Sequence, residues 1–267
     1  MIDLSSVAVS QFWVFLQVLI RFSSIVAIAP VFGARQVPTQ VKVGLTLVLS
    51  IALTPLVRSS FPSADLSPPH DLGGFATVIV LQSMVGMLMG FVVSLVLSAF
   101  QIAGSLLDLQ VGFSMAQTFD PELNSEATPL SQFQYYYALL LFLLANGHHI
   151  VLEALDRSFA LLPASKITLA SGSHLSLMTD VTFGALVNGV KIAAPTCAVL
   201  FIVDVSFALM SRAMPQLNIF FVGMPAKVIV GLLLIAVLLP ATAVFAGQMI
   251  SGEPSILSAL IHTMRSA

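Results

Sequence analysis

The chain alternates between long apolar runs and shorter polar segments that contain proline or glycine. Six apolar stretches cover residues 7–29, 43–57, 75–107, 135–152, 183–210 and 228–250. A helix rises about 1.5 Å per residue, so about 20 apolar residues cross a hydrocarbon core about 30 Å thick. The first, third, fifth and sixth stretches are long enough to do so. The second and fourth are shorter, which is typical of interfacial, tilted or protein-covered helices.

The third stretch, 75–107, would extend about 50 Å as one helix. It is therefore expected either to overshoot a bilayer or to break and fold back. All six runs are continuous and rich in leucine, alanine and methionine. These residues favour helix, whereas a transmembrane barrel needs alternation with a period of two. The pattern predicts an all-α fold of integral-membrane type, built from helical hairpins with about six long apolar stretches.

Composition strengthens this prediction. Of 267 residues, 58% are hydrophobic and only 8% are charged, against about 25% charged residues in an average soluble domain. Too few charges remain to cover the surface of a soluble globule, which excludes a soluble enzyme, and a disordered chain would need far more polar residues. The formal net charge is −2 without a basic run, so nucleic-acid binding has no electrostatic basis.

The sequence contains no recognisable catalytic or cofactor motif. Nucleophile elbow, P-loop and dinucleotide fingerprint are all absent, so no enzyme and no cofactor is predicted. Cys197 is the single cysteine, which rules out an intrachain disulfide and a cysteine-built zinc site. His149 and Glu153 could share a helix face, but a third ligand is missing nearby, so no metal site is predicted.

Three charges fall inside or at the ends of apolar stretches: Arg21, Lys191 and Asp204. A charge at the centre of a spanning helix costs about 2.5–3.5 kcal/mol on insertion scales, which makes it a functional candidate. Lys191 and Asp204 lie on one stretch but about 220° apart around a helix, so they do not pair locally. We expect pairing with a partner helix or contact with an aqueous interior, with ion relay as the alternative.

The basic residues do not define a membrane orientation. With six spans, the loops on one side carry four of them and the loops on the other side carry three. The positive-inside rule normally gives a clearer bias. A simple spanning topology is therefore not the expected arrangement.

Small residues recur every fourth position in the third stretch, at Gly86, Gly90, Ser94 and Ser98. On a helix this spacing lines one face with small side chains and lets another helix approach closely. The partner is either another helix of this chain or a helix of a different subunit.

The segment 108–134 changes character along its length. It begins small and apolar and becomes acidic at Asp120-Pro121-Glu122. Such a segment could pack as a removable, water-excluding plug, and the alternative is a re-entrant or surface loop without a gating role. The candidate plug residues are Gly112, Phe113, Ser114, Met115, Ala116, Phe119, Asp120, Pro121 and Glu122.

Four segments, in order, carry a family resemblance. They are VPTQVKVGL at 37–45, GFSMAQTFDPE at 112–122, LLFLLANGHH at 140–149 and RAMPQLNIFFVGMPAKVIVGLL at 212–233. Together they resemble the FliR family of flagellar biosynthetic proteins over essentially the whole chain, and the FVGMP core is closer to the flagellar than to the virulence branch. The resemblance points to Pro38, Lys42, Gly44, Asn146, Gly147, His148, Arg212, Pro215, Gln216, Asn218, Phe220, Gly223, Pro225 and Lys227 as motif and subunit-packing residues.

The resemblance implies a subunit of the flagellar type III protein export gate in the bacterial inner membrane, at the flagellar basal body. Family members assemble with FliP and FliQ into a closed helical complex around a channel, adjoined by FlhB and FlhA. Unfolded flagellar substrates pass through it. On this analogy, 1–267 is one FliR-like domain, with a FliP-like part at 1–182 and a FliQ-like hairpin at 183–267. The family's plug corresponds to residues 112–122, and apolar surface would be covered mainly by partner subunits and partly by membrane lipid.

Two alternatives stay open from the sequence. A polytopic secondary transporter for ions or small molecules would use the three intramembrane charges, with Pro195 and Pro240 as helix breaks. A scaffold subunit without contact to the pore is the other.

Overall fold

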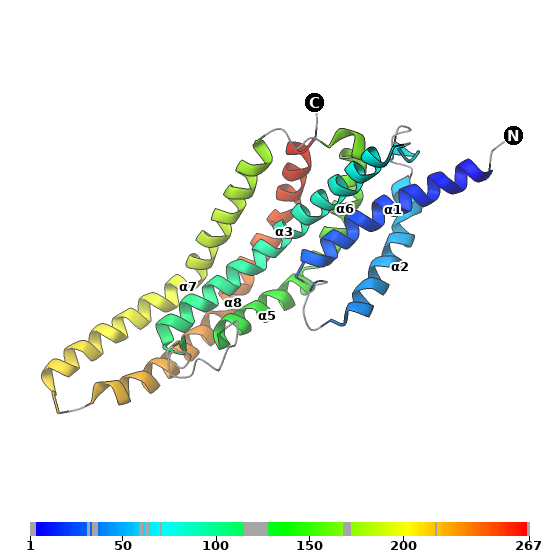
Figure 1. Cartoon of the computed structure of the whole chain (residues 1–267). Coiled ribbons are helices and arrows are strands. Elements are labelled where there is room, and N and C mark those ends of the chain that lie inside the picture. The colour runs from blue at the N-terminus through cyan, green and yellow to red at the C-terminus, as the bar shows by residue number, and fades with distance from the viewer. Residues whose placement is uncertain are drawn as a thin grey trace. The chain divides into compact units, whose positions relative to one another are not determined.

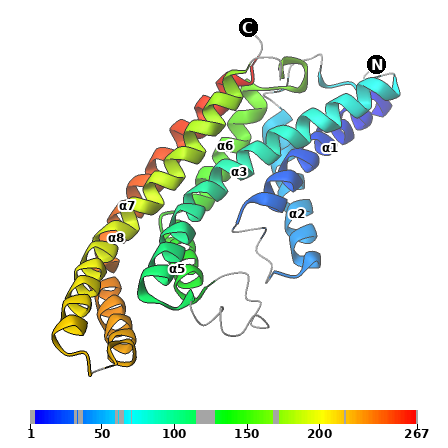
Figure 2. The ribbon, with the colours of Figure 1, turned by 60° about the vertical axis from the view of Figure 1, so that its left-hand side comes forward.

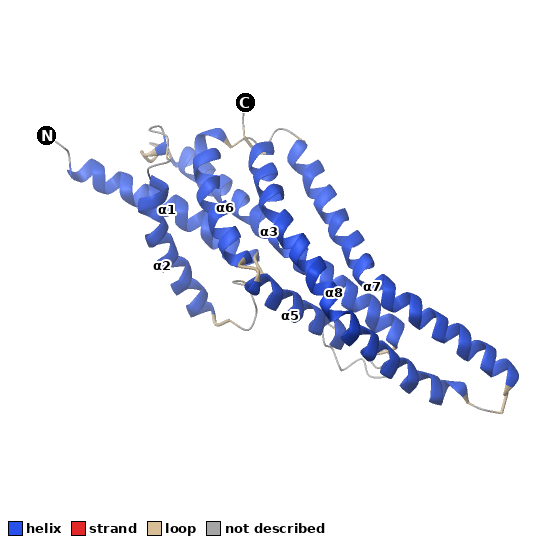
Figure 3. Cartoon of the chain, turned by 180° about the vertical axis from the view of Figure 1, so that it is seen from behind, coloured by secondary structure: helices blue, strands red, loops and turns tan. Residues whose placement is uncertain are grey.

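The computed structural model describes residues 4–30, 33, 37–58, 61, 65–69, 71–114, 128–167, 172–216 and 218–265. Across these ranges the regular structure is helical and contains no strand (Figure 3). The all-α prediction is confirmed. The helices are α1 (Leu4–Ile28), α2 (Thr39–Arg58), α3 (Leu72–Val111), α5 (Pro129–Leu144), α6 (Gly147–Leu161), the 3₁₀ turn η2 (Ala164–Lys166), α7 (Ser173–Ala213) and α8 (Ile219–Thr263).

Five of the described helices are long and apolar enough to cross a membrane, namely α1, α2, α3, α7 and α8. Helix α3 is continuous over 40 residues, so the third stretch does not fold back. The fourth stretch, predicted as one run at 135–152, is instead divided into α5 and α6, which meet at a bend of 65°. The break lies at Asn146, whose φ of 56° is left-handed, a conformation that asparagine tolerates better than most residues. Counted as one span, the bent pair raises the number to six.

The chain divides into two compact units, and α3, α7 and α8 contribute to both. Unit 1 comprises 1–95, 146–181 and 251–267, and unit 2 comprises 96–145 and 182–250. The sequence-order division into 1–182 and 183–267 follows the resemblance instead and stays a prediction.

In unit 1, α1 packs against both α2 and α3 (Figure 1). A Cβ at Gly86 would meet the backbone carbonyl of Arg21 and the Ser24 side chain, and one at Gly90 would lie 3.1 Å from Ile28 Cβ. The small-residue face of α3 is therefore used inside this chain at these two glycines. Val14, Val18 and Phe22 of α1 are fully buried.

In unit 2, α7 and α8 form an antiparallel hairpin (Figures 1 and 2). Little of this hairpin is covered. In the most apolar segment of each helix, 22% of α7 and 11% of α8 is buried, whereas 50% of α1 is buried. Phe201, Ile202, Leu233 and Val237 are among its large exposed side chains. An apolar surface of this kind in a folded chain is typical of contact with lipid or with other protein.

Candidate functional site

The candidate plug segment leaves α3 and returns at α5, and its base is held by a buried carboxylate. Asp108, in the last turn of α3, is fully buried. Its Oδ1 accepts the backbone N–H of Leu130 at 3.2 Å, and its Oδ2 accepts that of Ser131 at 2.9 Å. Asp108 thus joins the two ends of the segment, because Asp108 belongs to α3, which precedes the segment, and caps α5, which follows it.

This cap has a simple local cause. The first backbone N–H groups of a helix have no intrahelical acceptor, and a negative charge there is favourable. Pro129 opens α5 and has no N–H, while the Thr128 side chain makes no capping hydrogen bond. The two N–H groups that follow would be unsatisfied without Asp108.

The two helices approach each other closely behind this cap. A Cβ at Gly104 would run into the Ser131 backbone, so only glycine fits there. Ser131 Oγ donates to the Gln101 carbonyl at 3.2 Å and lies 3.3 Å from Ser105 Oγ. The beginnings of α5 and the end of α3 are therefore fixed to one another.

A hydrogen bond joins the same end of α3 to an ion pair within the α7–α8 hairpin. Lys227 Nζ lies 2.7 Å from Asp204 Oδ1 and 3.0 Å from Oδ2. Gln110 Nε2 donates to the same Oδ2 at 3.0 Å. The pair is partly open, since the exposed fraction of the Asp204 side chain is 40% and that of Lys227 is 18%. We call Asp108, Gln110, Ser131, Asp204 and Lys227 the loop-base cluster.

Apolar contacts reinforce this cluster. Val111 lies against Gly231 of α8, where a Cβ would come within 2.7 Å of Val111 Cγ2. Gly112 follows with φ of 102°, a left-handed value that suits glycine at the end of a helix, and a Cβ there would lie 3.8 Å from Met224 Cε. Of the candidate plug residues, Gly112, Phe113 and Ser114 are described and half-buried. Met115, Ala116, Phe119, Asp120, Pro121 and Glu122 lie outside the described residues.

The other predicted charges differ in their surroundings. Lys191 is exposed on α7 of the single chain, so its expected contact with a partner helix or an aqueous interior stays a prediction. Arg21, in unit 1, is fully buried. Its Nε donates to Gln82 Oε1 at 2.6 Å, Nη1 to Ser158 Oγ at 2.9 Å, and Nη2 to the Leu162 carbonyl at 2.9 Å. Asp204 pairs with a second helix of this same chain.

The Arg21 network extends further through polar side chains. The guanidinium stacks 4.1 Å above the Phe159 ring. Gln82 donates to Gln17 Oε1 at 2.9 Å, and Gln17 donates to the Asp65 carbonyl at 3.2 Å. Sequence reasoning missed both glutamines. Gln17 lies four residues before Arg21 on one helix face, which is the one local signal that Gln17 belongs to the network.

The remaining motif residues lie at helix ends and turns. Lys42 Nζ donates to the Gly33 carbonyl at 3.0 Å, Pro38 is exposed, and Gly44 faces open space. Gly147 is buried at the α5–α6 bend, and the His148 ring lies 4.3 Å from that of His149.

The 212–233 motif spans the turn of the α7–α8 hairpin. Gly223 is buried, and a Cβ there would be 3.5 Å from the Phe207 ring. The side chain of Phe220 is outside the described part of the structure. The exposed motif residues are Arg212, Pro215, Gln216, Asn218 and Pro225.

The described residues contain no group of three or more histidine, cysteine or acidic side chains placed to hold a metal ion. Both polar clusters lie inside a segment, residues 12–252, that matches the model of "Bacterial export proteins, family 1". The chain belongs to this family.

Its relatives are FliR proteins. The chain is 30% identical over 260 residues to the flagellar biosynthetic protein FliR of Bacillus subtilis, covering 97% of this chain and 95% of the relative. It is 32% identical over 254 residues to FliR of Escherichia coli, covering 95% and 93%. FliR of Caulobacter vibrioides is 26% identical over 234 residues, covering 87% and 91%. The resemblance to the FliR family drawn from four motifs is confirmed.

Proposed function

We propose that this FliR-family chain is the channel and plug subunit of a flagellar type III export gate. It forms part of the path by which unfolded flagellar substrates cross the inner membrane, and residues 112–122 close that path. The family match and the FliR relatives support a role in flagellar protein export, which requires no catalytic step from this chain. The observation that carries the plug role is the loop-base cluster.

A plug needs ends that are fixed to the protein and a middle part that can move out of the channel. Asp108 supplies a buried anchor that bonds to the start of α5, so the ends of the segment stay together whatever its middle does. The Asp204–Lys227 pair is partly exposed, so breaking it exposes no fully buried charge. The end of α3 contacts the hairpin through the Gln110–Asp204 hydrogen bond and the packing of Val111 on Gly231, and both contacts are separate from the Asp108 anchor.

The uncovered hairpin supports assembly with other subunits. Large apolar side chains along α7 and α8 are exposed in the single chain, as in a chain whose partners cover them. FliP and FliQ homologues are the proposed partners, adjoined by FlhB and FlhA at the basal body. In this proposal 183–267 is the FliQ-like hairpin and 1–182 the FliP-like part.

The structure offers less support for the transporter alternative. Arg21 uses all three guanidinium nitrogens on protein acceptors of unit 1. Such an arginine is held in place and does not need a transported ion. A scaffold without pore contact predicts, in contrast, that the 112–122 segment is dispensable for the permeability barrier.

The test replaces residues 115–122 by a glycine-serine segment of equal length in the co-expressed gate complex. Gly112 and Asp108 are kept, so the base stays intact. We expect normal co-purification with FliP and FliQ homologues and a measurable ion leak through the inner membrane. The control replaces the four residues 168–171 by a glycine-serine segment of four residues. An assembled complex that stays tight to ions would overturn the plug role.

A further inference from the structure

The end of α8 carries an acidic side chain that belongs neither to the loop-base cluster nor to the Arg21 network. Glu253 lies in the part of α8 that contributes to unit 1, and its exposed fraction is 0%. Leu257, Leu260 and Ile261 follow at helical spacing and are buried as well. Glu253 therefore occupies the inward-facing, otherwise apolar side of this helix end.

Helix α6 packs against the same end of α8 within unit 1. The two helices share a small cavity of about 30 Å³, lined by Ile150, Glu153, Ala154 and Arg157 from α6 and by Pro254, Ser258 and Ile261 from α8. Beyond the two helices, Ile167 and Arg265 form an antiparallel bridge. The end of α8 is thus attached to α6 and to the turn that follows it.

The Glu253 carboxyl group has no hydrogen-bond partner among the described residues. Both Oε1 and Oε2 are buried and unbonded. Figures 1 and 2 show α6 and the start of α7 beside this helix end. The ionisable residues of these elements, of η2 and of α8 itself are His148, His149, Glu153, Asp156, Arg157, Lys166, His174, Asp180, His262 and Arg265. None of them bonds to Glu253, and Glu153 and Arg157 pair with each other at exposed positions.

Two further segments of unit 1 bring no charge to this place. Residues 72–95 of α3 contain no ionisable side chain, and neither does the Thr-Leu-Ala-Ser connection at 168–171. The carboxyl group therefore lies on a buried face without a counter-charge from these segments.

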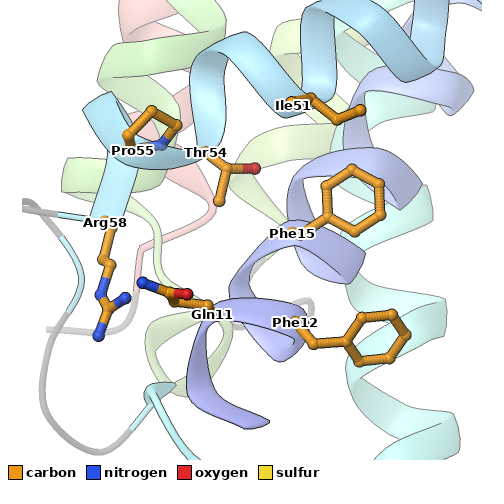
Figure 4. A pocket seen from close by; sticks show the side chains of 7 residues that line it. All are labelled: Gln11, Phe12, Phe15, Ile51, Thr54, Pro55 and Arg58. Atoms are coloured by element: carbon orange, nitrogen blue, oxygen red, sulfur yellow. The ribbon is translucent and has the colours of Figure 1, made fainter. Parts of the chain in front are cut away.

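Other polar side chains of unit 1 are solvated or bonded. Gln11 and Arg58 line an open groove between α1 and α2 (Figure 4), where Gln11 is exposed and Arg58 is half-buried. Arg21 is fully buried, but its three guanidinium nitrogens all have acceptors. Glu253 has neither water contact nor a bonded partner among the described residues.

An ionised carboxylate is very unfavourable in such surroundings. Moving a charge out of water without a partner costs far more than moving the neutral group, so a carboxylate in this position takes up a proton. A neutral carboxylic acid on the buried face of α8 is the form that the packing tolerates.

We propose that Glu253 is a proton-binding site, which holds the end of α8 on unit 1 as a neutral carboxylic acid. The carboxylate takes up one proton from water when this helix end packs, and it returns the proton to water when the helix end opens. Ionisation of Glu253 and packing of the helix end exclude each other. The inference concerns unit 1 alone and stands whether or not residues 112–122 are a plug.

The first test detects the proton directly in the full-length wild-type chain. Infrared spectroscopy at neutral pH should show the carbonyl stretch of a protonated carboxylic acid, and Glu253→Gln should remove this band. Absence of the band in wild type would mean that Glu253 is ionised and paired with a base or a bound cation, which would overturn the proposal. A band that persists in Glu253→Gln would belong to another acid and would overturn it as well. The wild-type spectrum alone decides the first outcome, even where a variant folds poorly.

The second test counts the proton through stability. In the unfolded chain a glutamate is ionised above about pH 5. While folded Glu253 keeps its proton, folding takes up one proton, so stability falls as pH rises. The unfolding constant of wild type, divided by that of Glu253→Gln, should therefore rise about tenfold per pH unit. Unfolding in mixed micelles, followed by circular dichroism, measures this ratio, and a flat ratio would overturn the proposal.

The matched control is Glu153→Gln, which removes an acid from an exposed position of the same unit. The ratio of wild type to this variant should stay flat above about pH 5, because an exposed glutamate is ionised there in both states. Hydrogen exchange, corrected for the intrinsic effect of pH, locates the change. Protection of 254–263 should fall with rising pH in wild type and stay constant in Glu253→Gln. Equal behaviour of the two proteins at 254–263 would show that the proton does not hold this helix end.

Discussion

Each unit holds a polar cluster among apolar helices, and the two clusters are built in different ways. In unit 1, the Arg21 charge is fully buried and is satisfied by neutral acceptors and an aromatic face. In unit 2, Asp204 and Lys227 neutralise each other directly, and both are partly exposed. A buried charge with neutral partners is costly to uncouple, whereas an exposed ion pair is cheap to break. The first cluster is suited to fixing helices, and the second to letting them move.

The proposed function supplies a reason for both designs on one chain. In that proposal, a subunit of an export gate stays assembled while its channel opens. On this view the Arg21 network stays intact during opening, whereas the Asp204–Lys227 pair can break and re-form. Asp108 is intermediate, because it is buried but caps only one helix. Three substitutions test this ranking.

The largest effect is expected for Arg21→Met. Methionine fits the apolar surroundings but leaves Gln82, Ser158 and the Leu162 carbonyl without their donor. Each buried group left unsatisfied costs about 1–3 kcal/mol, so the free energy of unfolding should fall by at least about 3 kcal/mol. Unfolding of the full chain in mixed micelles, followed by circular dichroism, measures this change.

Arg157→Met is the control for Arg21. Arg157 forms an exposed ion pair with Glu153 on α6, and such pairs are worth about 0–1 kcal/mol. Similar losses in both variants would contradict the assignment of a fixing role to the Arg21 network.

An intermediate effect is expected for Asp108→Asn. The amide oxygen can replace one carboxylate oxygen, so one of the Leu130 and Ser131 N–H groups loses its acceptor. The loss of a helix cap costs about 0.5–2 kcal/mol. Hydrogen exchange at the start of α5 should rise in this variant, and the assembled gate should leak ions. Unchanged exchange at Leu130 and Ser131 would show that Asp108 does not anchor the loop.

The helices follow from short-range information in the sequence, and the polar clusters do not. Periodicity and length placed the apolar runs, while the α5–α6 bend depends on a single left-handed residue, Asn146, within a continuous apolar stretch. Arg21 stood out because a charge in an apolar run is conspicuous. Its acceptors are 61 to 141 positions away, so composition could not identify them.

The role of Asp108 could not be predicted from the sequence either. In the sequence it reads as one more acid at the beginning of an acidic segment, although Thr128-Pro129 marks the start of a helix that needs a cap. Only the fold brings the carboxylate to those N–H groups. The Asp204–Lys227 pair is the easier case, since both residues lie at nearly equal distances from the turn of a hairpin. The role of residues 112–122 stays a prediction.

The smallest effect on stability is expected for Lys227→Gln, and it is the sharpest test of adjustability. The glutamine amide can still donate to Asp204, while the charge attraction is lost from a pair worth about 0–1 kcal/mol at partly exposed positions. The free energy of unfolding should therefore change by less than about 1 kcal/mol. If the pair fixes Asp204 as the acceptor for Gln110 of α3, the gate should nevertheless open more readily, seen as an ion leak smaller than that of the 115–122 replacement. The double variant Asp204→Asn with Lys227→Gln should behave like the single one, because the attraction is already gone. A leak in neither variant, with normal assembly, would make the pair a static contact and remove the contrast between the two clusters.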